Sequence, residues 1–330
     1  MTESLTARTV SAIYRYPIKG LSPQAVPGVE LEAGKPFPFD RLFALVRPNM
    51  PIDVDAPRWA KKGLFVMLML DEALAQVKTH LDVESLQLTV FGDPADGDEC
   101  VLRADLKTSR GRDAVEAFFG AQVLKLGATP RLVRAVDGHF MDKPDSVMSC
   151  INLATVRSLE AEWDRVVHPL RFRANFYIEG ARPWEEFDWI GSDIRLGDVL
   201  FHVDRRNGRC GATNVNPVTG ERDMDIPSAL RKRFGHKDLG VYLIARSNGR
   251  VLVGDRVSVP ELRAARTKPD PSSPPPPSPA SYICRGCYFI YDEAHRPQAF
   301  ERLPGDWPCP DCGTNKAQFR PYWSKLAASR

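Results

Sequence analysis

Four of the seven cysteines of this chain lie close together near its C-terminal end, in two Cys-x-x-Cys pairs. The pairs are Cys284 with Cys287 and Cys309 with Cys312, and residues 288–308 separate them. Two such pairs, brought together by a hairpin, offer four sulfur ligands to one ion at about 2.3 Å. Zinc and iron are the two metals that accept a tetrahedral thiolate site, and the spacing does not choose between them.

The residues between and just after the two pairs are more aromatic than a zinc ribbon requires to cover its ion. A shell of rings excludes water and tunes the reduction potential of a redox metal. The aromatic composition therefore favours a redox metal over a structural one. The aromatic residues are Tyr288, Phe289, Tyr291, Phe300, Trp307 and Phe319.

Two longer motifs surround the cysteines: CYFIYD begins at Cys287, and LPGDWPCPDCG encloses the second pair. With Lys316 and Phe319 beyond them, these motifs resemble rubredoxin, a one-iron electron carrier, over roughly residues 281–323. The tail departs from that pattern at Tyr288, where glycine is usual, and in its shorter loop between the pairs. Both departures are expected to shift the reduction potential, because hydrogen bonds to sulfur and solvent exposure set it. The resemblance implies one iron ion, and a structural zinc ribbon is the alternative.

Composition places the chain among ordinary globular proteins. It has 330 residues, 43% of them hydrophobic and 26% charged, with a formal net charge of +3. This length is sufficient for two domains and a small module. The mild charge does not indicate nucleic-acid binding, which usually needs a more basic domain or stripe. Residues 1–12 lack the apolar core of a signal peptide, and no run of about 18 apolar residues follows. With thiolates placed for metal binding, we expect a cytoplasmic protein without a membrane role.

A proline-rich segment, residues 267–281, divides the chain into a body and a tail. Its seven prolines, with serines between them, predict a semi-rigid spacer that would reach roughly 40 Å at about 3.1 Å per residue. The body is expected to contain an N-terminal domain over residues 1–127 and a second domain over residues 128–266. The tail then forms a small metal domain over residues 282–330.

Hydrophobic periodicity in the body predicts short strands joined by turns, with few helices, and so a β-rich α+β fold that contains a barrel. The dipeptide Asn248-Gly249, a preferred two-residue turn, predicts a hairpin between Val241–Ala245 and Val251–Val253. The stretch 64–77 is apolar without a clear period and is assigned no element. The other predicted elements are strands at Val10–Tyr16, Arg41–Val46, 86–90, Arg171–Ile178 and Val199–Val203, and helices at Ala114–Phe119, 153–167 and Ile226–Phe234.

A second group of reactive residues surrounds Cys210. Five arginines lie close to it in the sequence, three directly before it and two on the predicted strand one connection earlier. A cysteine beside so much positive charge is expected to be largely a thiolate, the form that attacks or binds metal. Planar guanidinium groups also suit a phosphate, since each can bind two of its oxygens. The alternative is a buried free cysteine with surface arginines nearby. The arginines are Arg171, Arg173, Arg205, Arg206 and Arg209.

Several motifs of the body are specific in their order and spacing. They are FRAN at 172–175, GRCGAT at 208–213, NPVTG at 216–220 and LVGD at 252–255. In this order they resemble the MOSC domain, with alanine in place of a proline in the first motif. Two further motifs, YPIK at 16–19 and DR at 40–41, resemble the N-terminal β-barrel domain that accompanies it. The resemblance covers about residues 8–260 and implies a MOSC-type β-barrel with an N-terminal β-barrel-like lobe.

One branch of this family, which includes the mitochondrial amidoxime-reducing component, binds molybdenum through a pyranopterin dithiolene. The resemblance to that branch implies that Cys210 is the protein ligand to molybdenum and that nearby polar side chains hold the pterin and its phosphate. Gly20 stands where a serine often follows the lysine, which puts one contact to the cofactor in question. The cofactor-binding residues implied by the resemblance are Lys19, Arg41, Arg173, Asn175 and Arg209.

Together these features predict a molybdenum-cofactor oxidoreductase that receives single electrons from iron in its own tail. The resemblance implies N-hydroxylated amines, amidoximes or sulfoxides as small-molecule substrates, and an upstream reductase as partner. The sequence leaves the direction of electron flow open. One alternative makes Cys210 a persulfide carrier that transfers sulfur, which leaves the tail unexplained. Another is a nucleic-acid-binding protein that uses the basic run 231–233, although acidic residues surround that run on a predicted helix.

Overall fold

The computed structural model describes residues 7–92, 99–124, 126–136, 138–259, 281–284, 290–293, 298–310 and 315–321. The chain divides into two compact units, Met1–Leu262 and Arg263–Arg330. All but the last residue of the predicted spacer 267–281 lie outside the described residues. Among the described residues, no helix is both long and apolar enough to cross a membrane.

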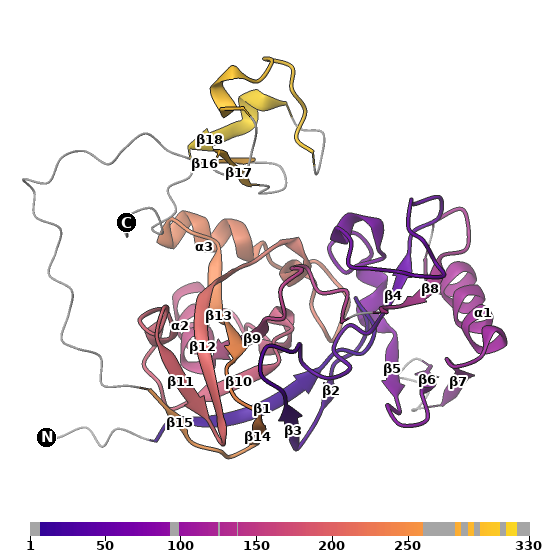
Figure 1. Ribbon diagram of the computed structural model, residues 1–330, viewed down its shortest axis with the longest axis horizontal. Coiled ribbons are helices and arrows are strands. Elements are labelled where there is room, and N and C mark those ends of the chain that lie inside the picture. The colour runs from indigo at the N-terminus through magenta and orange to yellow at the C-terminus, as the bar shows by residue number, and fades with distance from the viewer. Residues whose placement is uncertain are drawn as a thin grey trace, which may run out of the picture. The chain divides into compact units, whose positions relative to one another are not determined.

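The first unit is built on one large mixed sheet that curls into a half-barrel (Figure 1). Its strand order is β15-β11-β12-β13-β9-β10-β1-β2, and only β9 and β10 run parallel to each other. Because β1 pairs with β10, the two predicted domains of the body share this sheet. The strands are β1 (Thr9–Arg15), β2 (Gln24–Ala25), β9 (Met148–Asn152), β10 (Phe176–Glu179), β11 (Asp193–Leu196), β12 (Val199–Gly208), β13 (Asp238–Ala245) and β15 (Val257–Ser258).

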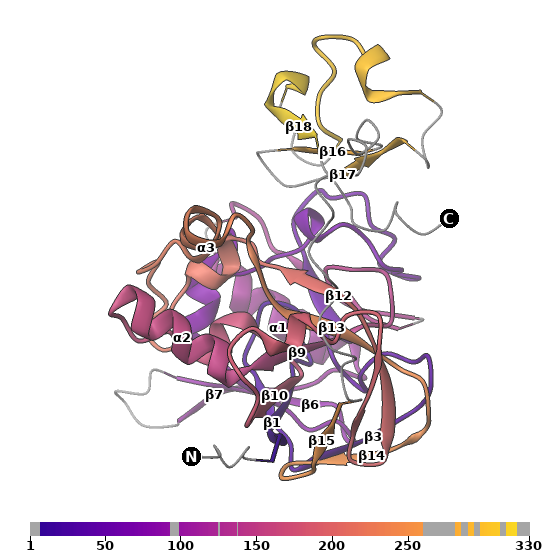
Figure 2. The same cartoon turned by 90° about the vertical axis from the view of Figure 1, so that its left-hand side faces the viewer.

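Apolar side chains cover both faces of the large sheet. The central strand β9 is buried at every position, as expected for a strand with packed layers on both sides. One face packs around Phe176, Trp189 and Phe201, each of which is fully buried. The other face is covered by the helices α2 (Leu153–Trp163) and α3 (Ile226–Phe234), which lie on the same side of the sheet (Figure 2).

Capping residues explain where these helices begin and end. Asn152 caps α2 by accepting a hydrogen bond from a backbone N–H of its first turn, and Asp225 does the same for α3. α3 ends before Gly235, whose φ of 75° closes the helix, so the predicted helix Ile226–Phe234 is confirmed. α2 ends short of the predicted residue 167 because Asp164 takes a left-handed conformation, with φ of 49°.

Five further strands of the first unit, β4 to β8, form a smaller lobe around a second apolar core that includes Leu88, Val115 and Phe119. Among the described residues this lobe has a three-stranded sheet, β5-β6-β7, and a two-stranded pair, β4-β8. The stretch 64–77, for which no element was predicted, contributes short 3₁₀ turns at Lys62–Leu64 and Glu72–Gln76. The elements are β4 (Phe43–Val46), β5 (Lys78–Leu81), β6 (Gln87–Phe91), β7 (Cys100–Asp105), α1 (Ser109–Phe118) and β8 (Arg131–Arg134).

The hairpin predicted around Asn248-Gly249 is wrong in its pairing. β14 (Gly249–Leu252) exists, but it pairs antiparallel with β3 (Gly28–Leu31) and not with β13. Both edges of β13 are already bonded, to β12 and to β9, so the chain must leave the large sheet after Ala245. The turn sequence therefore reverses the chain, but it joins two different sheets.

The strand predicted at Arg171–Ile178 forms only in its second half, as β10. Its first half is a 3₁₀ turn, Pro169–Phe172, in which proline occupies a first-turn position where its missing N–H is harmless. Arg173 then takes a left-handed conformation, with φ of 48°, before the chain enters the sheet. Arg171 therefore lies in a 3₁₀ turn and Arg173 follows it, so neither side chain belongs to a strand.

The second unit contains a three-stranded sheet with the order β17-β16-β18. Its core is largely aromatic, as the sequence predicts: the rings of Tyr282 and Phe300 stack at 4.2 Å between centroids, and Phe319 packs against Phe300 at 5.0 Å. Two buried cysteines, Cys284 and Cys309, belong to the same core. The elements are β16 (Ser281–Cys284), β17 (Ile290–Asp292), β18 (Phe319–Pro321) and 3₁₀ turns at Phe300–Arg302 and Lys316–Gln318.

The packing of α3 on the sheet predicts a stability effect. Leu230 is fully buried between α3 and the sheet, so Leu230→Ala should lower the free energy of unfolding by about 2–5 kcal/mol. Lys232→Ala on the exposed side of the same helix is the matched control and should change it by less than about 0.5 kcal/mol. Urea unfolding followed by circular dichroism measures both. Equal effects of the two substitutions would show that α3 does not pack as described.

Candidate functional site

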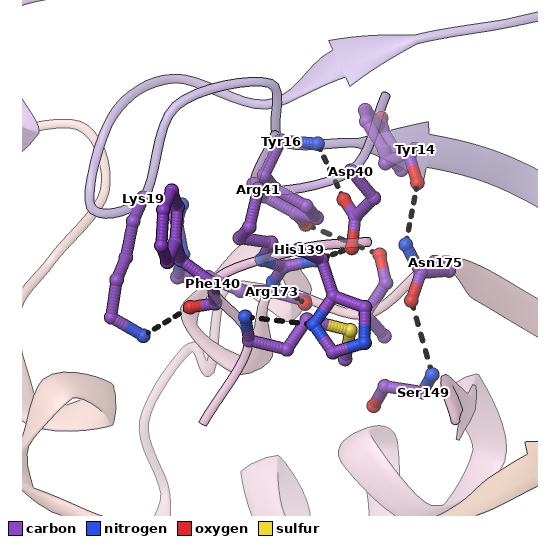
Figure 3. Close-up of polar contacts among 12 residues, drawn as sticks. Tyr14, Tyr16, Lys19, Asp40, Arg41, His139, Phe140, Ser149, Arg173 and Asn175 are labelled. Carbon is purple, nitrogen blue, oxygen red and sulfur yellow. Dashed lines mark hydrogen bonds and ion pairs between the residues drawn. The ribbon is translucent and has the colours of Figure 1, made fainter. Parts of the chain in front are cut away.

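The site is organised around the buried ring of Tyr16, which follows β1 (Figure 3). The guanidinium carbons of Arg41 and Arg173 lie 4.2 and 4.3 Å from the centroid of this ring. The Tyr16 hydroxyl donates to the carbonyl of Ala174 at 3.2 Å. The backbone N–H of Tyr16 donates to Asp40 Oδ1 at 2.8 Å. Burial raises the pKa of Tyr16 well above its usual value, so the ring faces both arginines as a neutral phenol.

The two arginines are held by a strained backbone. Arg41 and Arg173 both adopt left-handed conformations, with φ of 50° and 48°, which are uncommon for residues other than glycine. Arg41 Nη1 pairs with the buried carboxylate of Asp40, and its Nη2 donates to the carbonyl of Arg173 at 2.9 Å. Each such conformation costs on the order of 1–3 kcal/mol and persists only where surrounding contacts enforce it.

Arg173 carries a polar atom that the protein does not satisfy. Its Nη2 is buried and makes no hydrogen bond within the described part of the chain, which costs about 1–3 kcal/mol for a buried donor. Burial, and then the neighbouring charge of Arg41, lowers the pKa of Arg173 to about 10. An anionic oxygen bound here would accept this hydrogen bond and offset the repulsion between the two arginines.

A second charged group links Lys19 to Lys62 through Asp142. The buried Lys19 Nζ lies 2.6 Å from Asp142 Oδ1 and donates to the carbonyl of Phe140 at 2.8 Å, as Figure 3 shows for the latter contact. Lys62 Nζ lies 3.6 Å from the other carboxylate oxygen, Asp142 Oδ2. Although burial opposes it, the charges of the two lysines hold the pKa of Asp142 well below its usual range. The carboxylate therefore remains ionised.

Cys210 lies between the end of β12 and a short 3₁₀ turn, Gly211–Asn214, and is half-buried. Its carbonyl accepts hydrogen bonds from Thr213, at 3.1 Å from the backbone nitrogen and 2.9 Å from Oγ1. The Lys62 ammonium interacts electrostatically with the Cys210 side chain. Burial works against the charge of Lys62, yet Asp142 and Cys210 together raise its pKa. A cationic partner for the cysteine sulfur is therefore present.

Lys237 also interacts electrostatically with Cys210. Burial, and then the charge of Arg231, lowers the pKa of Lys237 to about 7, while Cys210 has the opposite effect. Two lysines from distant parts of the sequence, Lys62 and Lys237, thus interact electrostatically with Cys210.

Arg209 and Asn175 use their polar atoms on the backbone. Arg209 Nε donates to the carbonyl of Leu239 at 2.8 Å, and its Nη1 donates to the carbonyl of Phe172 at 3.0 Å. The Asn175 side chain accepts from the N–H of Ser149 at 3.1 Å and donates to the carbonyl of Tyr14 at 3.2 Å (Figure 3). Both side chains fix the segments that carry Cys210 and Arg173. Their assignment to the cofactor stays a prediction.

The other predicted arginines have separate partners. Arg171 clamps the loop after Cys210, because its Nη2 lies 2.7 Å from both carboxylate oxygens of Asp223. Arg205 forms ion pairs with Asp145 and with its neighbour Asp204, and Arg206 lies over the ring of Phe187 at 4.3 Å. Of the five arginines near Cys210 in the sequence, Arg173 is the one that joins the Tyr16 cluster.

Sequence reasoning missed Lys62, Asp142 and Lys237. No spacing relates these residues to Cys210, and none of them lies in one of the motifs that carry the family resemblance. Only the folded structure relates these residues to the site, so the sequence alone could not predict them.

In the tail, Cys284 and Cys309 are almost inaccessible to solvent and lie among Tyr282, Tyr291 and Trp307. Lys316 covers this core, since its Nζ donates to the carbonyls of Glu301 and Leu303 at 2.9 and 2.6 Å. The other two predicted ligands, Cys287 and Cys312, lie outside the described residues. Within the described ranges, no three His, Cys, Asp or Glu side chains form a group that could hold a metal ion.

Comparison with known proteins identifies nearly half of the first unit. The sequence profile of the MOSC domain matches residues 137–258, which include β9 to β15, Arg173 and Cys210. The chain therefore contains a MOSC domain, as the sequence motifs predict.

Relatives extend this similarity. The molybdenum cofactor sulfurase of Anopheles gambiae is 28% identical over 266 residues, which cover 69% of this chain and 33% of that protein. The molybdenum cofactor sulfurase of Drosophila mojavensis is 36% identical over 94 residues, covering 28% of this chain and 12% of that protein. The chain thus spans a third or less of these relatives. The crystal structure of the YUAD protein from Bacillus subtilis aligns with 77% of this chain and 96% of its own, at 12% identity and a TM-score of 0.35.

The low pKa of Lys237 makes the stability of the cofactor-free protein depend on pH. Between the folded value of about 7 and the usual 10.5, the unfolded chain binds more protons, so the free energy of unfolding rises with pH. Lys237→Met removes this titration, and the variant should gain less stability than the wild type between pH 7 and pH 9.

Urea unfolding at both pH values measures the gain. Lys35→Met removes a lysine from the exposed turn after β3 and should leave the wild-type dependence intact. If Lys237→Met behaved like Lys35→Met, the lysine would not hold a low pKa in the folded protein.

Proposed function

We propose that this protein is a molybdenum-cofactor oxidoreductase whose tail holds one iron ion and delivers electrons to the MOSC domain. The observation that carries the proposal is the unsatisfied, buried Nη2 of Arg173 within a MOSC domain. Arg41 and Arg173 are held close together over Tyr16, and Arg173 Nη2 has no acceptor among the described residues. Both features suit a bound anion.

The residues of this cluster fit the molybdenum cofactor in charge and in type. Arg41 and Arg173 would hold its phosphate, since guanidinium groups bind phosphate oxygens well. Lys19 would hold the pterin side, and Cys210 would supply a soft sulfur ligand. Molybdenum, when bound, supplies two-electron exchange with the substrate.

The protein's own contribution is to fix these groups before anything binds. Asp142 keeps Lys19 and Lys62 in place by bonding to both. Lys62 interacts electrostatically with the Cys210 side chain. Arg209 ties the segment before Cys210 to the turn that ends at Arg173. The binding groups are therefore largely in position in the ligand-free fold, which lowers the cost of ordering them.

The described part of the tail fits a thiolate-bound iron. Cys284 and Cys309 are buried among aromatic rings, so the surroundings of their sulfurs are dry. Such a shell tunes the potential of a one-electron metal site. With four thiolate ligands, Cys284, Cys287, Cys309 and Cys312, the iron would pass electrons singly. An upstream reductase would supply them, and the substrate would be an N-hydroxylated compound or a related N- or S-oxide. A structural zinc site is the alternative for the tail.

A second function is favoured by the two relatives described above, which are both named molybdenum cofactor sulfurase. In this alternative, Cys210 carries a persulfide and transfers its outer sulfur to an acceptor. Lys62 would serve here as well, because a persulfide is an anion at neutral pH. The alternative gives the tail no part, which is why we prefer the first.

Replacing Cys210 separates the two functions. Cys210→Ser exchanges a soft ligand for a hard, protonated one, while Arg41 and Arg173 remain to hold the pterin. We expect turnover of an N-hydroxylated test substrate to fall on the order of 100-fold or more, since even residues that only support a metal ligand cost 10–100-fold. The iron of the tail and much of the pterin should remain bound.

The exposed thiol of Cys100 provides the matched control, because Cys100→Ser makes the same chemical change far from the site. Mass analysis of the molybdenum-free wild type after incubation with a cysteine desulfurase tests the alternative. An added sulfur on Cys210, together with full turnover by Cys210→Ser, would favour the sulfur carrier over the oxidoreductase.

The tail site makes a prediction of its own. Iron bound by four thiolates absorbs visible light through sulfur-to-iron charge transfer, so the oxidised protein should be red and bleach on one-electron reduction. Cys309→Ser removes a buried ligand and should abolish most of that absorbance, whereas Cys100→Ser should keep it. Metal analysis accompanies the spectrum. A colourless protein with one zinc ion per chain, purified from iron-replete cells, would show that the site is a structural ribbon.

A further inference from the structure

A pocket that takes no part in the proposed function lies between the end of β1, strand β3 and residues 37–39. Its volume is about 260 Å³, which is room for a small organic molecule, since one water occupies about 30 Å³ of liquid. Most of the side chains around it are apolar, and Arg15 and Glu30 are the charged ones. The apolar wall consists of Val26, Val29, Phe37, Pro38 and Phe39.

Arg15 brings an unsatisfied donor to this pocket. It is the last residue of β1 and is half-buried. Its Nε is fully buried and has no hydrogen-bond partner among the residues that the structure describes. A buried donor of a charged group is costly to leave unpaired, and the guanidinium stays charged at neutral pH, as arginine does in proteins. An acceptor from outside the chain would satisfy this atom.

Two carboxylates belong to the surroundings of Arg15, and neither bonds to its Nε. The charge of Asp82 acts on Arg15 against the effect of burial, which lowers the arginine's pKa. Asp82 Oδ1 itself accepts the backbone N–H groups of Glu84 and Ser85, at 3.0 and 2.9 Å. The Glu30 side chain is 77% exposed and lies 3.6 Å from Arg250 Nε. These negative charges would oppose a doubly charged phosphate, whereas a single carboxylate meets one guanidinium with one charge.

The pocket and the Tyr16 cluster lie on opposite faces of β1. Successive side chains of a strand point to opposite faces. Ile13 belongs to the apolar core that contains Phe37, and Tyr14 packs on the other side against Tyr177, with ring centroids 5.5 Å apart. Arg15 therefore points to the side of Ile13. A molecule bound beside Arg15 would not occupy the position between Arg41 and Arg173.

We propose that this pocket binds a small molecule that carries one carboxylate on an apolar body. The carboxylate accepts two parallel hydrogen bonds from the Arg15 guanidinium, one of them from Nε, which is the favoured geometry of this pair. The apolar body lies against Phe37 and Phe39, of which Phe37 is buried and Phe39 is 38% exposed. The proposal does not depend on the proposed function, because it uses neither Cys210 nor the two arginines over Tyr16.

Three probes separate the contributions of charge and apolar contact. Phenylacetate carries both features, phenylacetamide has the same shape without the charge, and acetate has the charge without the ring. Each is titrated into the full chain, and binding is followed by saturation-transfer NMR of the probe. We expect phenylacetate to bind with a Kd on the order of 1 mM or lower. The other two probes should bind at least about tenfold more weakly, because each lacks one of the two interactions.

Substitutions locate the bound probe. Arg15→Gln should weaken phenylacetate binding about tenfold or more, since it removes a charged donor. Phe39→Ala should weaken it as well, through lost apolar contact. Arg103→Gln removes an exposed arginine from β7 and is the matched control, so it should leave the Kd unchanged. Circular dichroism confirms that each variant is folded.

Several results would overturn the proposal. They are equal affinity for phenylacetate and phenylacetamide, no saturable binding of phenylacetate in the millimolar range, and a Kd that either Arg15→Gln or Phe39→Ala leaves unchanged. The comparison of probes uses the wild type alone, so it decides the matter even if Arg15→Gln does not fold. Binding that survives Arg15→Gln but is lost in Arg173→Gln would place the anion at the Tyr16 cluster instead.

Discussion

The first unit constrains two guanidinium groups to pack against one buried phenol ring. A cation over an aromatic face gains about 1–2 kcal/mol when desolvated, yet Arg41 and Arg173 repel each other, and both backbones are left-handed. The buried, unbonded Nη2 of Arg173 adds a further cost. Such an arrangement does not form because it is stable by itself. The rest of the fold holds it in place.

The restraints come from three directions. The Asp40 carboxylate binds both the N–H of Tyr16 and the guanidinium of Arg41, so one residue positions the ring and one of its cations. Asn175 connects β1 to β9 just beyond Arg173. Arg209 pins the segment before Cys210 to the turn that carries Arg173. A ligand that binds the folded state and not the unfolded state stabilises the folded state. An anion bound beside Arg173 would therefore relieve the strain that the ligand-free fold contains.

The sequence predicted correctly those elements whose bounds depend only on neighbouring residues. The predicted helix Ile226–Phe234 forms with these bounds because its cap Asp225 and its closing Gly235 act at its two ends. The predicted hairpin at Asn248-Gly249 was wrong in its pairing, because a turn dipeptide carries no information about which strand edges are already paired elsewhere in the fold.

The candidate site was predictable where residues fall in motifs and not where the fold alone assembles them. Cys210, Arg41 and Arg173 lie in recognisable motifs, and the structure groups Arg41 with Arg173 around Tyr16. Lys62 and Asp142 come from turns without any periodic pattern, and only the folding of the chain brings them together.

The pairing of β1 with β10 limits how the MOSC region can be separated from the rest of the first unit. The profile match begins at residue 137, so the strand Thr9–Arg15 lies outside it, although it covers an edge of the same sheet. A MOSC region separated from this strand would present the bare hydrogen-bonding edge of β10, which invites association with other chains. Recombination at the boundary of the profile would therefore produce an aggregation-prone fragment. The unit that can be inherited, fused or transplanted intact must include the N-terminal strand.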